Sequence, residues 1–451
     1  MRLTRPSRGQ TFGLLHMTEE VQVVELDAVH GHTRGGKQER EDVGQGGEAD
    51  GGGDTVCLSS ERLDDVLSET VIVVPCKDEE LVVIQGVVSA IPTRCLVILV
   101  SNCERAENDQ YMQQVAMAKT FRGYNNRQIL VVHQKDPMAA SAFQSSGFPQ
   151  LINPAEGTIR NGKGEGMLLG IALASAFCPG RRYIGFVDAD NFNATSVYEY
   201  CKAFAAGFAM SSPEEEDTMV RLRWSSKPKL HDGRLDFVSE GRCSKIVNSW
   251  LNKLISPAAK KWTGTDNPLV TTGNAGEHAL TMSLALKLRM AAGYAIEPFH
   301  FIDLLERGHL LPVDSGAICH GTSGAGNSPQ LLERPVRVVQ IRTISAHFHR
   351  ASDDEHIRHM WASGLGSVYH GLTPYDTMPG SLDGDIQKLR QDMHDFAAAH
   401  GGLDDTTGEL PRPKIYPALE NIDMHKFREL LEPSVGIGSL RAIGFVQISR
   451  L

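Results

Sequence analysis

Apolar residues between positions 68 and 191 gather in short continuous runs that alternate with amphipathic stretches. The runs are TVIVVP (70–75), CLVILVS (95–101), QILVVHQ (128–134) and RRYIGFVDADN (181–191). Continuous apolar runs of this length are typical of strands that are buried on both faces. The intervening stretches 79–91, 109–121 and 163–178 have helical spacing. Strand and helix thus alternate as in βαβ units, which predicts an α/β fold with a mostly parallel central sheet and flanking helices.

The pattern is less regular on either side of this region. Residues 10–28 predict short strands, 336–344 predicts a further strand, and 243–256, 277–293 and 353–370 have helical spacing, with Gly293 as a C-cap. Residues 30–54 are rich in glycine and charge and lack the apolar residues that a core needs. We therefore expect N-terminal strands (1–29), a disordered insert (30–60), a main domain (61–330) and a C-terminal extension (331–451).

Composition excludes several classes of protein. Fifty-five acidic residues outnumber 45 basic ones, so the net charge of −10 argues against a nucleic-acid-binding protein. The sequence contains no run of about 18 apolar residues, so we expect no membrane-spanning helix. The first residues lack the apolar segment of a secretory signal. The eight cysteines form no CxxC pair, and we expect reduced thiols in the core of a cytoplasmic protein.

Charged and polar residues follow the predicted strands, at the carboxyl ends where α/β sheets bind ligands. Asp188 and Asp190 follow the strand ending in YIGFV, and two carboxylates there can share one divalent cation. Such a cation would neutralise a diphosphate leaving group. The alternative interpretation of the two aspartates is an ordinary solvated turn without a metal. His347 or His349, just after the strand at 336–344, could complete the metal shell.

Three glycine-containing segments carry further candidate chemistry. Lys163 lies in a glycine-rich turn that opens a helix and could hold an anion, as could Lys77; the turn is not a Walker A motif. Arg242 lies with Ser244 at the start of another helix and suits a phosphate or carboxylate. In GNAGEH (273–278) the small residues permit close approach, and Glu277 could hold a sugar hydroxyl. For each segment a plain surface turn or helix cap is the alternative. His356 and His359, in a polar helical stretch, are expected at the surface.

Several short motifs, in one order, resemble the mannosyl-3-phosphoglycerate synthase family. They are VVPCKDE (73–79), LVSNCER (99–105), RNGKGEGM (160–167), VDADN (187–191), GRCSKIVNSWLN (241–252), TGNAGEHAL (272–280), GYAIEPF (293–299) and QIRTISAHFH (340–349). The resemblance implies a retaining hexosyltransferase of GT-A-like fold, whose main domain binds a nucleotide sugar and an acceptor. Such enzymes transfer mannose from GDP-mannose to the 2-hydroxyl of 3-phosphoglycerate, in mannosylglycerate biosynthesis, with a divalent metal.

The resemblance also implies roles for individual residues. The donor would contact Pro75, Lys77, Glu79, Ser101, Asn102, Lys163 and Asp188; the acceptor would contact Gly241, Arg242 and Ser244; the metal ligands would be Asp188, Asp190 and His347; and Asp190, Lys163 and Glu277 would be catalytic. His349 stays an alternative to His347, because Ser345-Ala346 stands where the family has Asn-Pro. Magnesium is the expected ion, with Mn²⁺ or Co²⁺ as alternatives, and a homodimer is an option.

Three other functions compete with this interpretation. Glucosyl-3-phosphoglycerate synthase shares the chemistry but uses another donor. A sugar nucleotidyltransferase would need a glycine-rich basic motif after the first strand, and VPCKDEE (74–80) fits that poorly. A non-catalytic sugar-nucleotide-binding module would keep the acids only as loop charges.

Overall fold

The computed structural model describes most of the chain. The described residues are 1–6, 9–27, 55–104, 109–191, 193–231, 234–263, 268–308, 332–348, 353–372 and 383–436. Most of the predicted insert and His349 lie outside them, as do Cys319 and residues 313–330, whose glycine- and serine-rich sequence predicts a loop. Residues 55–60, at the end of the predicted insert, instead contain the strand β5 and the first residue of helix α1.

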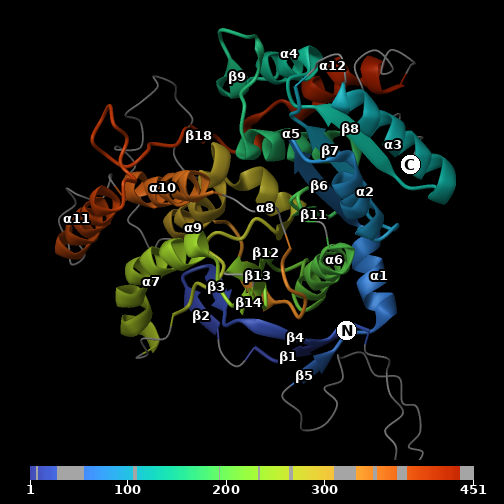
Figure 1. Cartoon of the computed structure of the whole chain (residues 1–451). Helices are drawn as coiled ribbons and strands as arrows, with labels where there is room; N and C mark the ends of the chain where they lie inside the picture. The colour runs from blue at the N-terminus through green and yellow to red at the C-terminus, as the bar shows by residue number, and fades with distance from the viewer. Residues whose placement is uncertain are drawn as a thin grey trace, which may run out of the picture.

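A 12-stranded sheet forms the centre of the molecule (Figure 1). Across the sheet the strands are β5 (Thr55–Cys57), β1 (Arg2–Thr4), β4 (Val21–Glu25), β17 (Val336–Arg342), β12 (Asp217–Arg223), β15 (His278–Thr281), β11 (Tyr183–Phe186), β6 (Thr70–Cys76), β7 (Leu96–Ser101) and β8 (Ile129–His133). β3 (Leu15–Thr18) also pairs with β17, and β2 (Gly9–Phe12) pairs with β3. The four strands predicted from apolar runs are β6, β7, β8 and β11, and all four are confirmed.

Most of the pairings in the middle of the sheet are parallel, which confirms the predicted fold class. β11, β6, β7 and β8 pair in parallel, as do β12, β17 and β4. β15 runs antiparallel to both of its neighbours, β11 and β12. The amino end of β15 therefore lies at the same edge of the sheet as the carboxyl ends of the strands beside it.

Helices cover both faces of the sheet. They are α1 (Ser60–Ser68), α2 (Leu81–Ala90), α3 (Gln110–Asn125), α4 (Pro137–Ser145), α5 (Lys163–Phe177), α6 (Ala194–Ala209), α7 (Arg242–Thr263), α8 (Met282–Lys287), α9 (Ile296–Arg307), α10 (Asp354–Gly371), α11 (Asp383–Ala399) and α12 (Met424–Gly436). Strand residues alternate between the two cores: Val71 and Val73 pack with α5, whereas Ile72 and Val74 pack with α2 and α6. In Figure 1, α1, α2 and α3 lie to the right of α7, α10 and α11.

The helix predicted for 277–293 is wrong. His278–Thr281 form β15, whose four residues are all buried between β11 and β12, and only Met282–Lys287 are helical. Pairing with two neighbouring strands here overrides a segment rich in helix-forming residues. Gly293 caps no helix C-terminus; it follows β16 (Met290–Ala291) and adopts a φ of 58° at the start of the short helix η2 (Gly293–Ala295).

The central sheet contains strands from the predicted N-terminal strands, the main domain and the C-terminal extension. β4 comes from the N-terminal strands, β12 from the main domain, and β17, which lies between them, from the C-terminal extension. Farther along, β18 (Ile415–Tyr416) pairs with β16. The boundaries at residues 60 and 330 stay predictions, but the sheet continues across both.

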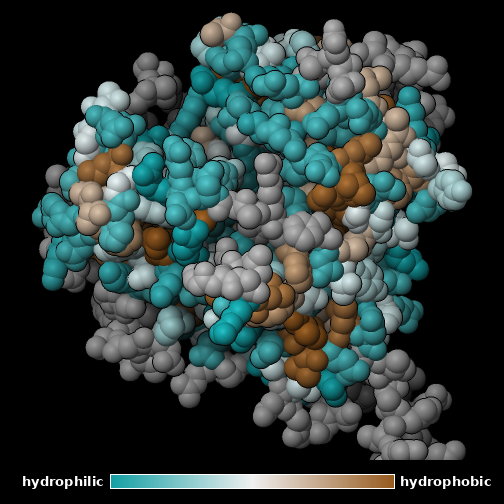
Figure 2. Space-filling model, viewed as in Figure 1, coloured by the Kyte–Doolittle hydropathy of each residue, from teal (hydrophilic) through white to brown (hydrophobic). Residues whose placement is uncertain are grey.

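The surface on the face seen in Figure 2 is mainly hydrophilic, with apolar residues in separate small groups. Six of the seven described cysteines are buried and all seven are free thiols, as predicted for core residues; Cys57 is exposed. Across the described residues, we find no helix whose length and apolar content would let it cross a membrane.

Candidate active site

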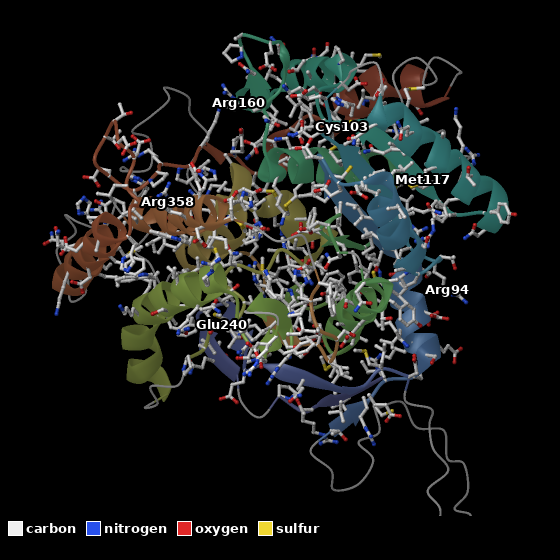
Figure 3. All side chains as sticks on the ribbon, in the orientation of Figure 1. Arg94, Cys103, Met117, Arg160, Glu240 and Arg358 are labelled. Carbon is white, nitrogen blue, oxygen red and sulfur yellow. The ribbon has the colours of Figure 1, made fainter. Side chains whose placement is uncertain are left out.

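A cavity of about 670 Å³ opens at the carboxyl edge of the sheet. Its walls come from the segments after β6, β11, β12 and β17, from the start of β15, and from the first residues of α5 and α7. Figure 3 labels Arg160 and Glu240, which precede two of these segments and lie well apart in the view. The segments that line the cavity are far apart in the sequence, and the order of the strands in the sheet brings them to one site.

Lys163 is held by two carboxylates in this cavity. Its Nζ lies 2.7 Å from Asp188 Oδ1 and 2.9 Å from Glu297 Oε1. Burial opposes the charge of Lys163, but the two carboxylates outweigh burial and raise the pKa of Lys163 well above its usual value. Lys163 is therefore a permanent cation beside Asp188, the first of the two aspartates that follow β11.

Gly276 allows this close arrangement, and Gly162 lies at the start of α5. A Cβ atom on Gly276 would lie 2.5 Å from Asp188 Oδ2 and 3.0 Å from Lys163 Nζ. Gly162, with a φ of 150°, precedes the first residue of α5, and no side chain caps that helix N-terminus. The N–H groups and dipole of α5 thus add to the attraction for an anion near Lys163.

Acidic side chains crowd the other side of Asp188. Burial and the charges of Asp188 and Glu277 raise the pKa of Asp190 to about 7. Burial, with Asp188 as the next cause, likewise raises the pKa of Glu277 to about 7. The Oε1 atom of Glu277 accepts from Asn191 Nδ2 at 3.0 Å, and Oε2 accepts from Trp224 Nε1 at 3.3 Å. The cluster holds more negative charge than Lys163 neutralises.

His347 lines the same cavity from the segment after β17. Its ring stacks on Trp224, with centroids 3.8 Å apart and planes 2° from parallel, and Tyr200 Oη lies 2.9 Å from Nδ1. Burial, reinforced by Lys227 and Lys163, lowers the pKa of His347 well below its usual value. The imidazole is therefore neutral, which is the form that binds a metal.

The oxygen and nitrogen atoms of Asp188, Asp190 and His347 are of the kinds that bind a divalent cation, although these side chains do not surround a common point. In the described part of the chain, no group of three or more His, Cys, Asp and Glu side chains is placed to hold a metal ion. Asp188, Asp190 and His347 nevertheless line one cavity. Next to them, the buried Oδ1 of Asn191 has no hydrogen-bond partner. A cation would relieve the raised pKa of Asp190 and suits these oxygen and nitrogen donors.

The predicted donor residues mostly meet in the cavity. Pro75, Lys77, Glu79 and Asn102 line it together with Asn161, to which Asn102 donates a hydrogen bond. Glu79 Oε2 accepts from the backbone N–H of Lys77 at 2.7 Å. Ser101 is the exception among these predicted residues. It is fully buried outside the cavity wall, and its hydroxyl donates to Cys103 Sγ at 3.1 Å.

The predicted acceptor residues line another part of the same cavity. Gly241, Arg242 and Ser244 lie where α7 begins. The guanidinium of Arg242 is half exposed, and its Nη1 lies 2.6 Å from Asp354 Oδ1 at the start of α10. The structure thus brings the predicted donor, metal and acceptor residues to one cavity, with Ser101 left out.

Comparison with known proteins identifies the family. The model of the family described as mannosyl-3-phosphoglycerate synthase matches residues 5–431. The chain belongs to the mannosyl-3-phosphoglycerate synthase family. A mannosyl-3-phosphoglycerate synthase from Pyrococcus furiosus is 36% identical over 83% of this chain and 87% of its own, and one from Aeropyrum pernix is 31% identical over 82% and 85%.

A solved structure is distantly similar. Glucosyl-3-phosphoglycerate synthase from Mycobacterium tuberculosis, in complex with Mn²⁺, UDP-glucose and glycerol 3-phosphate, aligns with 81% of this chain and 96% of its own. The identity is 14% and the TM-score 0.46.

Some of the residues that lie in or next to this cavity were not predicted from the sequence. Glu297 and Tyr294 lie inside the recognised motif GYAIEPF, but neither spacing nor charge linked them to Lys163. Trp224 follows β12 and Tyr200 lies in α6, and only the fold brings them to His347. For Gly276 the sequence carried a usable signal, since its small neighbours indicated close approach.

Proposed function

We propose that the chain transfers mannose from GDP-mannose to the 2-hydroxyl of 3-phosphoglycerate with retention at the anomeric carbon, on a GT-A-like fold. Membership of the family supports this activity. The observation that carries it in the structure is the Asp188–Lys163–Glu297 arrangement, which shares its cavity with the start of α7. A nucleotide sugar and a small anion thus have sites on one cavity.

Asp188, Asp190 and His347 would hold a divalent cation, which we propose to be Mg²⁺. When bound, such an ion supplies charge neutralisation to the diphosphate. Lys163 and the uncapped N-terminus of α5 add positive potential at the same group. The start of α7, with Arg242 and Ser244, binds an anionic group of the acceptor and so positions its hydroxyl.

In the proposed reaction, the bond between the anomeric carbon and the diphosphate oxygen breaks, and its electron pair leaves with GDP. The acceptor's 2-hydroxyl oxygen bonds to the same carbon from the same face, and its proton passes to the departing phosphate oxygen. Both oxygens of Glu277 already accept hydrogen bonds from Asn191 and Trp224. This supports Glu277 as a group that holds the sugar and not as a covalent nucleophile.

One assay tests the proposal against its alternatives. The protein is incubated with GDP-mannose, 3-phosphoglycerate and Mg²⁺, and GDP and mannosylated phosphoglycerate are measured. Asp190→Ala should reduce transfer at least a hundredfold, while Asp405→Ala, at an exposed position, should not. Transfer from UDP-glucose instead would indicate a glucosyl enzyme, and pyrophosphate release a nucleotidyltransferase. No turnover with any donor would contradict an enzymatic role.

A further inference from the structure

One side of α10 faces the cavity. His359 and Met360 lie three and four residues after His356, and Ser363 lies four residues after His359, so the four share one side of α10 and all line the cavity wall. The sequence predicts the two histidines at the surface of a polar helix. His359 is exposed, as predicted, and His356 is half-buried. Both also line the wall of the candidate active site, where the proposed mechanism gives them no role.

Tyr294 links these histidines to the catalytic lysine. The His356 ring meets the Tyr294 ring edge-on, with centroids 5.5 Å apart and an angle of 86°, and the His359 ring does so at 6.2 Å and 81°. Burial raises the pKa of Tyr294, and the charges of Lys163 and Asp188 act on the same hydroxyl. The two imidazoles therefore contact a tyrosine whose hydroxyl is subject to the charges of Lys163 and Asp188.

The same wall adjoins the predicted acceptor site. Asp354, two residues before His356, forms the 2.6 Å ion pair with Arg242. Asp353 Oδ1 accepts from the backbone N–H of His356 at 2.7 Å, so this carboxylate caps α10. Arg412 also lines the cavity and adds a permanent positive charge. Arg242 with Ser244 forms one group of hydrogen-bond donors on this cavity, and the two histidines with Arg412 form another.

The chemistry of the acceptor needs two such groups. 3-Phosphoglycerate carries a phosphate at one end and a carboxylate at the other, with the reacting hydroxyl between them. One anion site would leave the molecule free to rotate, whereas two fix the position of the hydroxyl. The start of α7, with Arg242 and Ser244, suits the phosphate. An imidazole donates a hydrogen bond whether neutral or charged, which suits a carboxylate on the other wall.

On the basis of the proposed function, we propose that His356 and His359 bind the carboxylate of the acceptor. The pair makes the enzyme select a phosphorylated hydroxy acid over a phosphorylated polyol. Glycerol 3-phosphate, which lacks the carboxylate, therefore gains nothing from these two side chains.

The test uses two double variants and a control. H356F/H359F keeps aromatic rings against Tyr294 but removes the donors, and H356N/H359N removes the rings but keeps an N–H donor at each position. H425F changes an exposed histidine on α12, with a side-chain exposure of 82%. The measurements are the KM and the calorimetric Kd for 3-phosphoglycerate, the Ki of glycerol 3-phosphate, and the Kd of GDP.

H356F/H359F should raise the KM and Kd for 3-phosphoglycerate at least tenfold, and H356N/H359N should recover part of that loss. The Ki of glycerol 3-phosphate and the Kd of GDP should stay within twofold, and H425F should change none of these values. An unchanged Kd for 3-phosphoglycerate in H356F/H359F would overturn the proposal, as would an equal loss for glycerol 3-phosphate. If the unmodified protein binds 3-phosphoglycerate but transfers no mannose to it, the proposed function fails while the binding comparison still decides this inference.

Discussion

Lys163 and Glu297 show how a positive charge is stabilised inside the protein. Glu297 is almost fully buried, and Lys163 is its ion-pair partner among the described contacts. Removing only the lysine leaves a buried carboxylate without its counter-charge, which is more unfavourable than removing both groups. We therefore expect Lys163→Met to lower the free energy of unfolding by about 3 kcal/mol, and the double variant with Glu297→Gln to regain most of it.

Urea unfolding of the single and double variants measures this coupling. Transfer activity should fall at least a hundredfold in both, because both lack the positive charge at the diphosphate. Stability thus separates the ion pair from the catalytic role. A Lys163→Met protein as stable as the unmodified one would contradict the coupling.

Asp190 makes stability depend on pH. Its folded pKa of about 7 is above the ordinary value of 3.8. Between these pH values the folded protein binds more protons than the unfolded chain, so stability falls as pH rises through this window. The destabilisation is absent below about pH 4 and complete above about pH 7, where it reaches on the order of 4 kcal/mol.

Thermal unfolding from pH 5 to pH 8 without divalent ions checks the prediction. Asp190→Asn should flatten the decline in Tm with rising pH. Adding Mg²⁺ or Mn²⁺ at pH 8 should raise the Tm of the unmodified protein by several degrees and that of the variant much less. Parallel curves for the two proteins would show that Asp190 does not carry the effect.

At the scale of elements, the loop before β15 is built around Gly276. A methyl group there would lie 2.5 Å from Asp188 Oδ2, so Gly276→Ala should push Asp188 and Lys163 apart. We expect transfer activity to fall at least tenfold, since displacement of catalytic groups by even an ångström is costly. Stability should change little, because the displaced atoms are the ends of side chains.

Gly180→Ala is the matched control, because nothing lies within 4 Å of the added atom. Initial rates and unfolding curves of both variants give the comparison. If Gly276→Ala keeps full activity, the ion pair tolerates the displacement and the close packing is not required.

The elements also show what the sequence can predict. The strands β6, β7, β8 and β11 were predictable because burial on both faces demands unbroken apolar residues. β15 was not, since four residues carry too little pattern and their neighbours favour a helix. Because β15 runs antiparallel to its neighbours, Glu277, which precedes it, lies at the cavity. The sequence pointed to Glu277 through the small residues around it and not through a strand.

The site was predictable wherever residues follow a strand or open a helix. Asp188, Lys163 and Arg242 occupy such positions, and the alternation of elements brings them to one edge. Glu297 pairs with Lys163, which lies far from it in the sequence, and Trp224 likewise stacks on the distant His347. No local pattern encodes such contacts, because tertiary packing alone creates them.

At the scale of the whole molecule, the C-terminal part of the chain supports the start of α5. β18 pairs with β16, and Tyr416 Oη donates to the buried Glu165 Oε1 at 2.8 Å. Glu165 Oε2 in turn accepts from the N–H of Gly293 at 3.1 Å. A segment some 250 residues away (416 − 165 = 251) thus fixes the first turn of the helix that carries Lys163.

Tyr416→Phe should therefore weaken both the fold and the site. Burial raises the pKa of Glu165, and the variant leaves one of its buried oxygens without a donor. Stability should fall by about 1–3 kcal/mol. The KM for GDP-mannose should rise several-fold, because the first turn of α5 is less firmly held.

Tyr124→Phe serves as the control, since this tyrosine is 90% exposed on α3 and loses the same hydroxyl. Urea unfolding and donor titration of the two variants separate a specific hydrogen bond from a general effect of the substitution. If the variants behave alike, the C-terminal segment packs on α5 without influencing Lys163. If Tyr416→Phe alone weakens donor binding, the contact between β18 and α5 belongs to the catalytic apparatus, because the hydroxyl is the only group that differs.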